Sequence, residues 1–285
     1  MIGTGALASR TAVLLLAMAL LSGDGSQAAG DAAALVWDRA RAAVDTLDGL
    51  GSALRRALDE ARTGASRTVQ GDQPPGEALS SAAELVEDAR EAAKDAVAAV
   101  SAFDGVRRAQ DPGAPTLPAA VQPAELQAVA DELRAAAPGA DEFAGMRRRS
   151  TDLLEHVDGA LANLVNGRLT EAGTEVRAAR ADHDALLGWT VGSGTMLLWL
   201  GTTDAMISAV TALIDAGIAN DPEAAARASA ELAAIGPRAS EADRALRIAI
   251  AEGAAEVTSP ALQRLAAAIA DVDELRIAVA GDVGP

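Results

Sequence analysis

Apolar residues recur at intervals of three and four along most of this chain, the spacing that places side chains on one face of an α-helix. The pattern is clearest over residues 77–103, where an apolar stripe faces away from a run of carboxylates. The same period predicts helices over residues 31–62, 141–166 and 169–187. We therefore expect an all-α fold, a multi-helix bundle of about eight mostly antiparallel amphipathic helices that follow an N-terminal signal peptide.

Proline and glycine mark the expected helix boundaries. Pro138-Gly139 and Gly236-Pro237 are predicted to end helices, because proline removes a backbone donor and clashes with the preceding turn. Asn166-Gly167 is typical of a left-handed helix end, which would make the two helices around it antiparallel neighbours. Asn220-Asp221-Pro222-Glu223 combines a capping residue, a first-turn proline and a carboxylate, so it predicts a helix start. Residues 64–76 are expected to form a loop.

A proline-rich stretch divides the predicted helices into two groups. Residues 104–123 contain four prolines, and a long helix cannot cross such a segment. We predict a linker here, with an N-terminal helical hairpin over residues 29–103 and a C-terminal helical bundle over residues 124–285. A long crossover within one bundle is the alternative.

The first residues predict an export signal. Arg10 precedes the uncharged run 11–21, and Ser26-Gln27-Ala28 places small residues at the positions that a signal peptidase recognises. An eleven-residue helix spans about 16 Å, roughly half of the hydrocarbon core of a membrane. We therefore interpret residues 1–28 as a signal peptide, with an uncleaved anchor as the alternative, and expect the protein to be secreted, periplasmic or in the cell envelope.

A second uncharged stretch lies inside the chain, over residues 185–203. Its 19 residues are long enough to raise the question of a membrane span. Gly192-Ser193-Gly194 would interrupt one continuous helix, however, and a soluble bundle needs a helix that is buried on all sides. We favour a buried central helix here over membrane anchoring.

Composition excludes several function classes. The 285 residues carry 41 Asp and Glu against 24 Lys and Arg, a net charge of −17, so binding to nucleic-acid phosphates is not expected. The chain has no cysteine, which excludes disulfides and a thiol nucleophile, and aromatic residues make up only 2% of it. The common nucleophile-elbow, phosphate-loop and zinc-protease motifs are missing from the sequence. We expect a protein that is not an enzyme and that needs no cofactor.

Two histidines give the sharpest candidate for a ligand site. His156 and His183 lie on the helices that flank Asn166-Gly167, and Asp152 lies one turn before His156. Imidazole and carboxylate groups on facing helices can bind a metal ion or a small ligand. The alternative interpretation is that His183 is a core residue with its hydrogen bonds satisfied and that His156 is half-exposed.

Arginines around the same turn give a second candidate. Arg147, Arg148 and Arg149 follow one another on a predicted helix, and Arg177 and Arg180 lie on the next one. Consecutive helical residues fan out, so only some of them can face one ligand. We take Arg147, Arg148, Arg177 and Arg180 as a candidate anion site, with ion pairs inside the protein as the alternative.

Together these features predict a non-enzymatic helical-bundle protein that acts by protein–protein interaction or as a structural component of the envelope. The partner is an unknown protein or a second copy, bound through the hairpin over residues 31–103 in the manner of a coiled coil. The alternative is a small-ligand or metal-binding carrier that uses His156 and His183.

Overall fold

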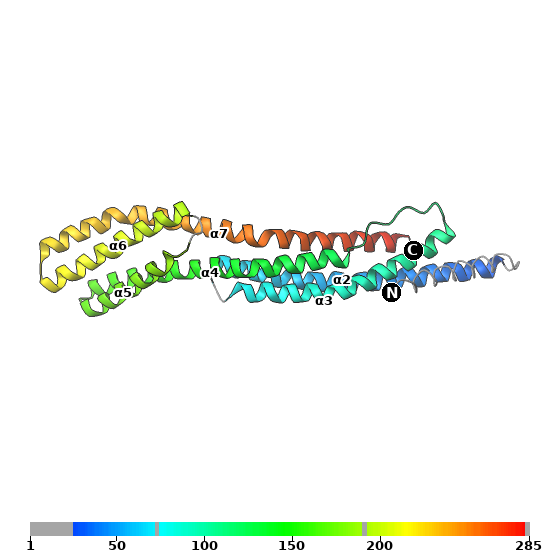
Figure 1. The fold of residues 1–285 in the computed structure, drawn as a ribbon, viewed down its shortest axis with the longest axis horizontal. Helices are drawn as coiled ribbons and strands as arrows, with labels where there is room; N and C mark the ends of the chain where they lie inside the picture. The colour runs from blue at the N-terminus through cyan, green and yellow to red at the C-terminus, as the bar shows by residue number, and fades with distance from the viewer. Residues whose placement is uncertain (1–24, 72–73, 190–192, 283–285) are drawn as a thin grey trace. The chain divides into compact units, whose positions relative to one another are not determined.

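The computed structural model describes residues 25–71, 74–189 and 193–282. Over these residues the secondary structure is helical, without a strand, which confirms the all-α class (Figure 1). Six helices follow one another along the described chain: α2 (Gly25–Gln70), α3 (Pro75–Gln110), α4 (Pro123–Val165), α5 (Leu169–Leu186), α6 (Ser193–Ala219) and α7 (Pro222–Gly281).

The described helices are fewer and longer than the expected eight, because several predicted ends are not ends. Helix α4 continues through Pro138, and α7 continues through Pro237 and Pro260. All three prolines lie on exposed faces. A helical proline frees the carbonyl four residues earlier. On an exposed face water can bond that carbonyl, while the buried face goes on packing.

Two other boundaries also shift. Helix α2 runs on to Gln70, so the connection expected over residues 64–76 is shorter than predicted. The side chain of Thr68 is fully buried there and donates to the carbonyl of Gly64 at 2.9 Å. Helix α3 likewise continues to Gln110, into the predicted linker. In both cases the packing of the last helical turns outweighs the preference of the local sequence for a loop.

The helix ends expected at Asn166-Gly167 and at Asn220-Asp221-Pro222-Glu223 are confirmed. Gly167 has φ +71°, and the amide of Arg168 donates to the carbonyl of Asn163, which closes the end of α4. At the start of α7 the carboxylate of Asp221 accepts from the amides of Glu223 and Ala224, at 3.0 Å each. These residues satisfy backbone donors that a helix start otherwise leaves free.

The helices form two compact units, each with its own interior. Of the described chain, the first contains residues 25–62, 78–135 and 260–282. Its described helical segments are antiparallel neighbours, held across α2 and α7 by Arg55 with Asp273 at 2.5 Å and by Arg276 with Asp48. Leucine, valine and phenylalanine side chains fill the interior, among them Leu47, Leu50, Leu54, Leu79, Val86, Phe103, Leu126, Leu133, Leu265, Val272 and Leu275.

The proline-rich connection between α3 and α4 is fastened to this first unit. Arg107 is buried and donates to the carboxylates of Asp104, at 2.8 Å, and Asp282, and to the carbonyl of Pro115. Burial by itself lowers the pKa of Arg107, but hydrogen bonds to Asp282 and Asp104 outweigh it and raise that pKa. The guanidinium therefore stays charged and joins the connection to the ends of α3 and α7.

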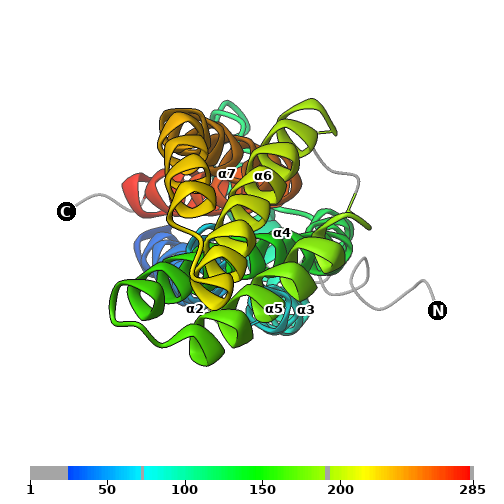
Figure 2. The ribbon, with the colours of Figure 1, turned by 90° about the vertical axis from the view of Figure 1, so that its left-hand side faces the viewer.

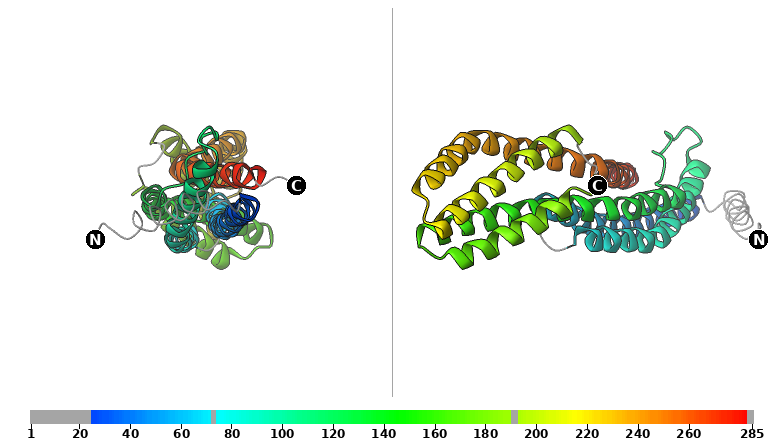
Figure 3. Two further views of the ribbon diagram at one scale, coloured as in Figure 1. Left: turned by 90° about the vertical axis from the view of Figure 1, so that its right-hand side faces the viewer. Right: turned by 60° about the vertical axis from the view of Figure 1, so that its left-hand side comes forward.

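Of the described chain, the second unit contains residues 63–71, 74–77, 136–189 and 193–259. Helices α4 and α5 form one antiparallel pair, and α6 forms another with the start of α7 (Figure 3). Glycine permits close approach at Gly253, where an added Cβ would lie 2.3 Å from the ring of Phe143. The interior is built around Phe143, Met146, Leu153, Val157, Leu186, Met196, Trp199, Leu200, Ile207, Val210, Leu246 and Ile250.

The apolar stretch over residues 185–203 is not one buried helix. Helix α5 ends at Leu186 and α6 begins at Ser193, at the predicted glycine break. Trp199 is fully buried, whereas Leu197 and Leu198 are 65% and 62% exposed. The prediction of a buried central helix is therefore wrong, because α6, which Figure 2 shows beside the start of α7, leaves large apolar side chains exposed.

Two expectations about the ends and divisions of the chain stay predictions. The proposed signal peptide covers residues 1–28, of which residues 1–24 lie outside the described part. The expected domains over residues 29–103 and 124–285 differ from the two units, because the first unit takes in the end of α7.

Candidate functional site

His156 lies on α4 between two carboxylates of α5. Its Nδ1 is 2.7 Å from a carboxylate oxygen of Glu175, and its Nε2 is 3.9 Å from a carboxylate oxygen of Asp182. Asp182 also contacts Arg149 at 3.4 Å. The imidazole is therefore held from both sides, and the two carboxylates lie at opposite ring nitrogens, where they cannot bind one ion together with it.

His183 has different surroundings. It is 5% exposed, and its Nε2 lies 3.2 Å from the carbonyl of Leu200 on α6. Its Nδ1 is 3.5 Å from a carboxylate oxygen of Asp184 and has no hydrogen-bond partner. Nε2–H can donate to the carbonyl, so this side chain helps to join α5 to α6 in the core.

The structure does not bring the expected metal ligands together. His156 and His183 take separate partners, and Asp152 is not among the carboxylates that contact His156. Across the described ranges, no cluster of three or more histidine, aspartate or glutamate side chains has an arrangement that suits a metal ion. A carrier role for these histidines stays a prediction, which metal analysis of the purified protein and of a His183→Ala variant would test.

The candidate anion set is also spread out. Arg177 is exposed and bonds to the carbonyl of Gly173 on its own helix, and Arg180 pairs with Asp204 of α6. Arg148 is exposed. Arg147 differs, because its Nη1 atom is buried and has no hydrogen-bond partner within the described chain.

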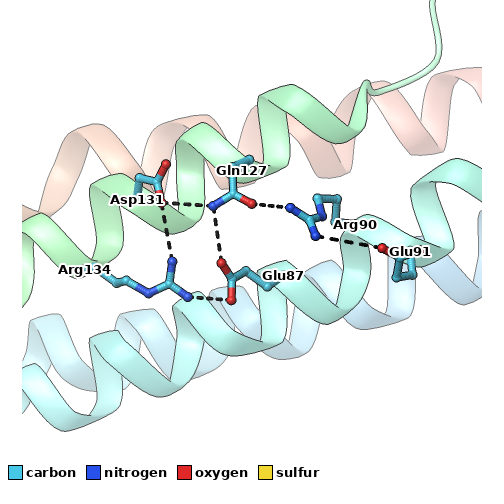
Figure 4. Close-up of polar contacts among 6 residues, drawn as sticks. All are labelled: Glu87, Arg90, Glu91, Gln127, Asp131 and Arg134. Carbon is cyan, nitrogen blue, oxygen red and sulfur yellow. Dashed lines mark hydrogen bonds and ion pairs between the residues drawn. The ribbon is translucent and has the colours of Figure 1, made fainter.

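The densest polar network lies in the first unit, between α3 and α4 (Figure 4). Glu87 accepts from Arg134 at 2.6 Å and from Gln127 at 3.3 Å. Gln127 also donates to Asp131 at 3.0 Å, and its amide oxygen accepts from Arg90. Sequence reasoning placed Glu87 on a solvated acidic face and missed this network, because the partners come from a helix about forty residues later.

The electrostatics of Glu87 indicate a structural role. Hydrogen bonds from Arg134 and then Gln127 lower its pKa, and the charges of Arg134 and Arg90 act in the same direction. Glu87 is thus ionised at neutral pH, and its oxygens are already bonded to neighbours. A general acid needs a proton to donate near neutral pH, so this carboxylate is unsuited to that task.

A pocket of about 240 Å³ lies between α3 and the proline-rich connection. Arg108 is on its rim and pairs with Asp104 at 2.8 Å. The remaining lining carries aliphatic, hydroxyl or amide groups and includes Val97, Val100, Ser101, Thr116, Leu117, Pro118, Ala120 and Gln122. The volume is below that of typical ligand sites, and the lining presents no nucleophile–base pair.

Helix α6 exposes several large apolar side chains. Leu197, Leu198 and Ile218 are each more than 60% exposed, and between them the exposed positions include Gly201, Ser208 and Asp215. Residues Gly194–Ala219 are the one described segment that is long and apolar enough to cross a membrane, with a mean hydropathy of 1.6. Only 39% of its most apolar window is buried.

Comparison with known proteins adds no relative: no family model matches the chain, and no curated protein or solved structure gives a significant match.

Proposed function

We propose that this protein is an exported, non-enzymatic helical bundle that acts by binding another protein at the exposed face of α6. The observation that carries the proposal is the exposure of Leu197 and Leu198, at 65% and 62%, on a helix whose other face is packed into the second unit. Large neighbouring apolar side chains on a surface of this kind are typical of an interaction site.

The packing of α6 favours a protein partner over a membrane-spanning role. Asp204 of α6 pairs with Arg180 of α5, and Leu200 accepts from His183. Crossing a membrane would expose Asp204 to lipid or break its pair, at a cost of several kcal/mol for the charge. An apolar helix of a partner could instead cover Leu197 and Leu198 and leave these contacts in place.

The hairpin that sequence reasoning favoured has less apolar surface to offer. Its stripe, which includes Leu47, Leu54, Leu79 and Val86, is buried inside the first unit. Self-association through residues 31–103 would have to use the polar faces of α2 and α3. We therefore place the proposed interaction on α6.

Photo-crosslinking in cells tests the proposal. A photoreactive amino acid at Leu198 is expected to give a discrete protein adduct, either with a partner or with a second copy. The matched control is Val165, which is 88% exposed but lies at the end of α4. Equal adducts at both positions, lipid adducts at Leu198 alone, or none at either position would contradict the proposal.

Export has its own readout. Cell fractionation with intact mass measurement is expected to find a chain that begins at Ala29 outside the cytoplasm. A cytoplasmic protein that retains residues 1–28 would refute export, but it would not contradict the proposed role of α6.

A further inference from the structure

The exposed side chains of α6 change in size along one side of the helix. Leu197 and Leu198, near its start, are 65% and 62% exposed. The next exposed positions on that side are small: Gly201, Ser208 and Ala212. Ile218 follows six residues after Ala212, about 120° around the helix, and belongs to another side. This side of α6 therefore protrudes at its start and is shallow from Gly201 onward.

The same side of α6 ends on a carboxylate. Asp215 lies three residues after Ala212 and is exposed, and the last turn of the helix holds no basic residue. The first turn holds no acidic residue. A helix carries a partial positive charge at its start and a partial negative charge at its end. Asp215 therefore lies near the unfavourable end of its own helix, while the first turn of α6 offers an anion a favourable place.

Two copies of this side fit each other when their α6 helices run antiparallel. With the two-fold axis beside Ala205, Leu198 of each copy lies opposite Ala212 of the other, so a large side chain meets a small one. The same axis places Asp215 of each copy beside Gly194, in the first turn of the other copy's α6. Both matches occur twice, because a two-fold interface is formed by the same surface on both copies.

Charge also favours a second copy in this orientation. The net charge of −17 makes most faces of two copies repel each other. On α6 the one other charged residue is Asp204, and Arg180 neutralises it. A parallel pair would bring the two Asp215 carboxylates together and set Leu198 against Leu198. The antiparallel pair separates the like charges and uses the difference in side-chain size along the helix.

We propose that α6 binds α6 of a second copy of this chain in an antiparallel pair centred on Ala205. The inference rests on the function proposed above, since it names the occupant of the same face. Leu197 and Leu198 of each copy cover the shallow part of the other, and Asp215 stabilises the start of the other copy's helix. The apolar side chains on this side of α6 are thereby removed from water.

Engineered cysteines test the register, because the natural chain contains none. A mixture of the Leu198→Cys and Ala212→Cys chains is expected to form disulfide-linked dimers under mild oxidation. Either chain alone should not, since residue 198 of one copy lies about 20 Å along the helix axis from residue 198 of the other, which is too far for a disulfide. No link in the mixture, or an equal link in either chain alone, would refute the antiparallel pair.

Sedimentation equilibrium of the purified full chain tests the pairing itself. The wild type is expected to dimerise. Ala212→Leu fills the shallow part and should weaken the dimer at least about 10-fold, because it overpacks the interface at two places. Asp215→Asn should weaken the dimer by about 3- to 30-fold, because two attractions to helix starts are lost. Ala255→Leu, an exposed change on α7, is the matched control and should leave the dimer unchanged.

A monomeric wild type, or a dimer that Ala212→Leu leaves intact, would overturn the second-copy proposal. The proposed function has its separate readout in the photoreactive residue at Leu198. An adduct there with a different protein, together with a monomeric wild type, would leave α6 as an interaction face and refute only its self-pairing. An adduct with the mass of two copies would support both.

Discussion

The ion pairs that join these helices to one another are made mainly by arginine side chains. Arg55, Arg107, Arg134 and Arg180 each reach a carboxylate on another segment, and the only lysine, Lys94, pairs with Glu91 on its own helix at 2.6 Å. A guanidinium can meet two acceptors at once with fixed geometry, which an ammonium cannot. The choice of arginine therefore favours links between helices over local pairs.

Arg134 offers a test with a defined pH dependence. Its hydrogen bond lowers the folded-state pKa of Glu87, so the interaction stabilises the fold above the unfolded-state pKa of Glu87 and is lost as pH falls through the folded-state pKa. Arg134→Gln should lower the melting temperature slightly at pH 7, and the difference from the wild type should shrink towards zero in the acid range.

Arg56→Gln is the matched control for that series, because Arg56 is exposed and the change in net charge is the same. It should leave the melting temperature almost unchanged at every pH. A difference between Arg134→Gln and the wild type that persists unchanged in acid would mean that Glu87 is not the partner that matters.

At the scale of the site, sequence reasoning found some residues and missed their partners. It singled out His156 and Arg147, whose surroundings are indeed unusual. It could not find Glu175, the partner of His156, since that contact depends on which helix faces which and in what register. One sequence shows the face of a helix on which a residue lies, but not the neighbour that covers that face.

At the scale of elements, the apolar periodicity predicted where the helices lie. The prediction that helices end at proline was wrong in several places. Asn166-Gly167 and Asp221 mark true boundaries, because their side chains or backbone angles satisfy groups that a helix end leaves free. Pro138, by contrast, lies on the exposed side of a helix whose inner side is buried. The residue type alone does not tell these two situations apart.

Pro138→Ala is therefore expected to stabilise the protein. The change restores one helical hydrogen bond and relieves a clash, and an exposed helix interior favours alanine over proline by up to about 3 kcal/mol. Removal of the proline also makes the unfolded chain more flexible, and the added entropy of that state offsets about 0.4–1 kcal/mol of this gain. Denaturant unfolding should show a net increase of about 1–2 kcal/mol.

Pro222 supplies the comparison for this change, because it occupies the first turn of α7, where proline lacks no needed donor. Pro222→Ala should bring no gain in stability. Equal gains from the two variants would show that the position within the helix is not the cause.

At the scale of the whole molecule, the two units cut across the order of the chain. The last part of α7 belongs with α2 and α3, and Leu265, Val272 and Leu275 are buried there. A fragment of residues 124–285 is therefore expected to keep helix in the second unit and to lose it over residues 260–281. Hydrogen exchange, compared with the full chain, measures this directly.

The same fragment also tests whether residues 104–123 separate two domains, as the sequence predicts. Slow exchange over residues 260–281 in the fragment would support a C-terminal bundle that folds alone. Fast exchange there, with the rest protected, would show that the end of α7 needs α2 and α3.

The use of arginine in the links between helices has a consequence for alkaline solutions. Arginine keeps its proton far above neutrality, and the chain has no tyrosine or cysteine and only one lysine that could titrate there. The charge on the molecule should therefore stay nearly level from neutral pH to about pH 10. Electrophoretic mobility should reach a plateau across that interval, and the attractions between segments should survive treatment with mild base.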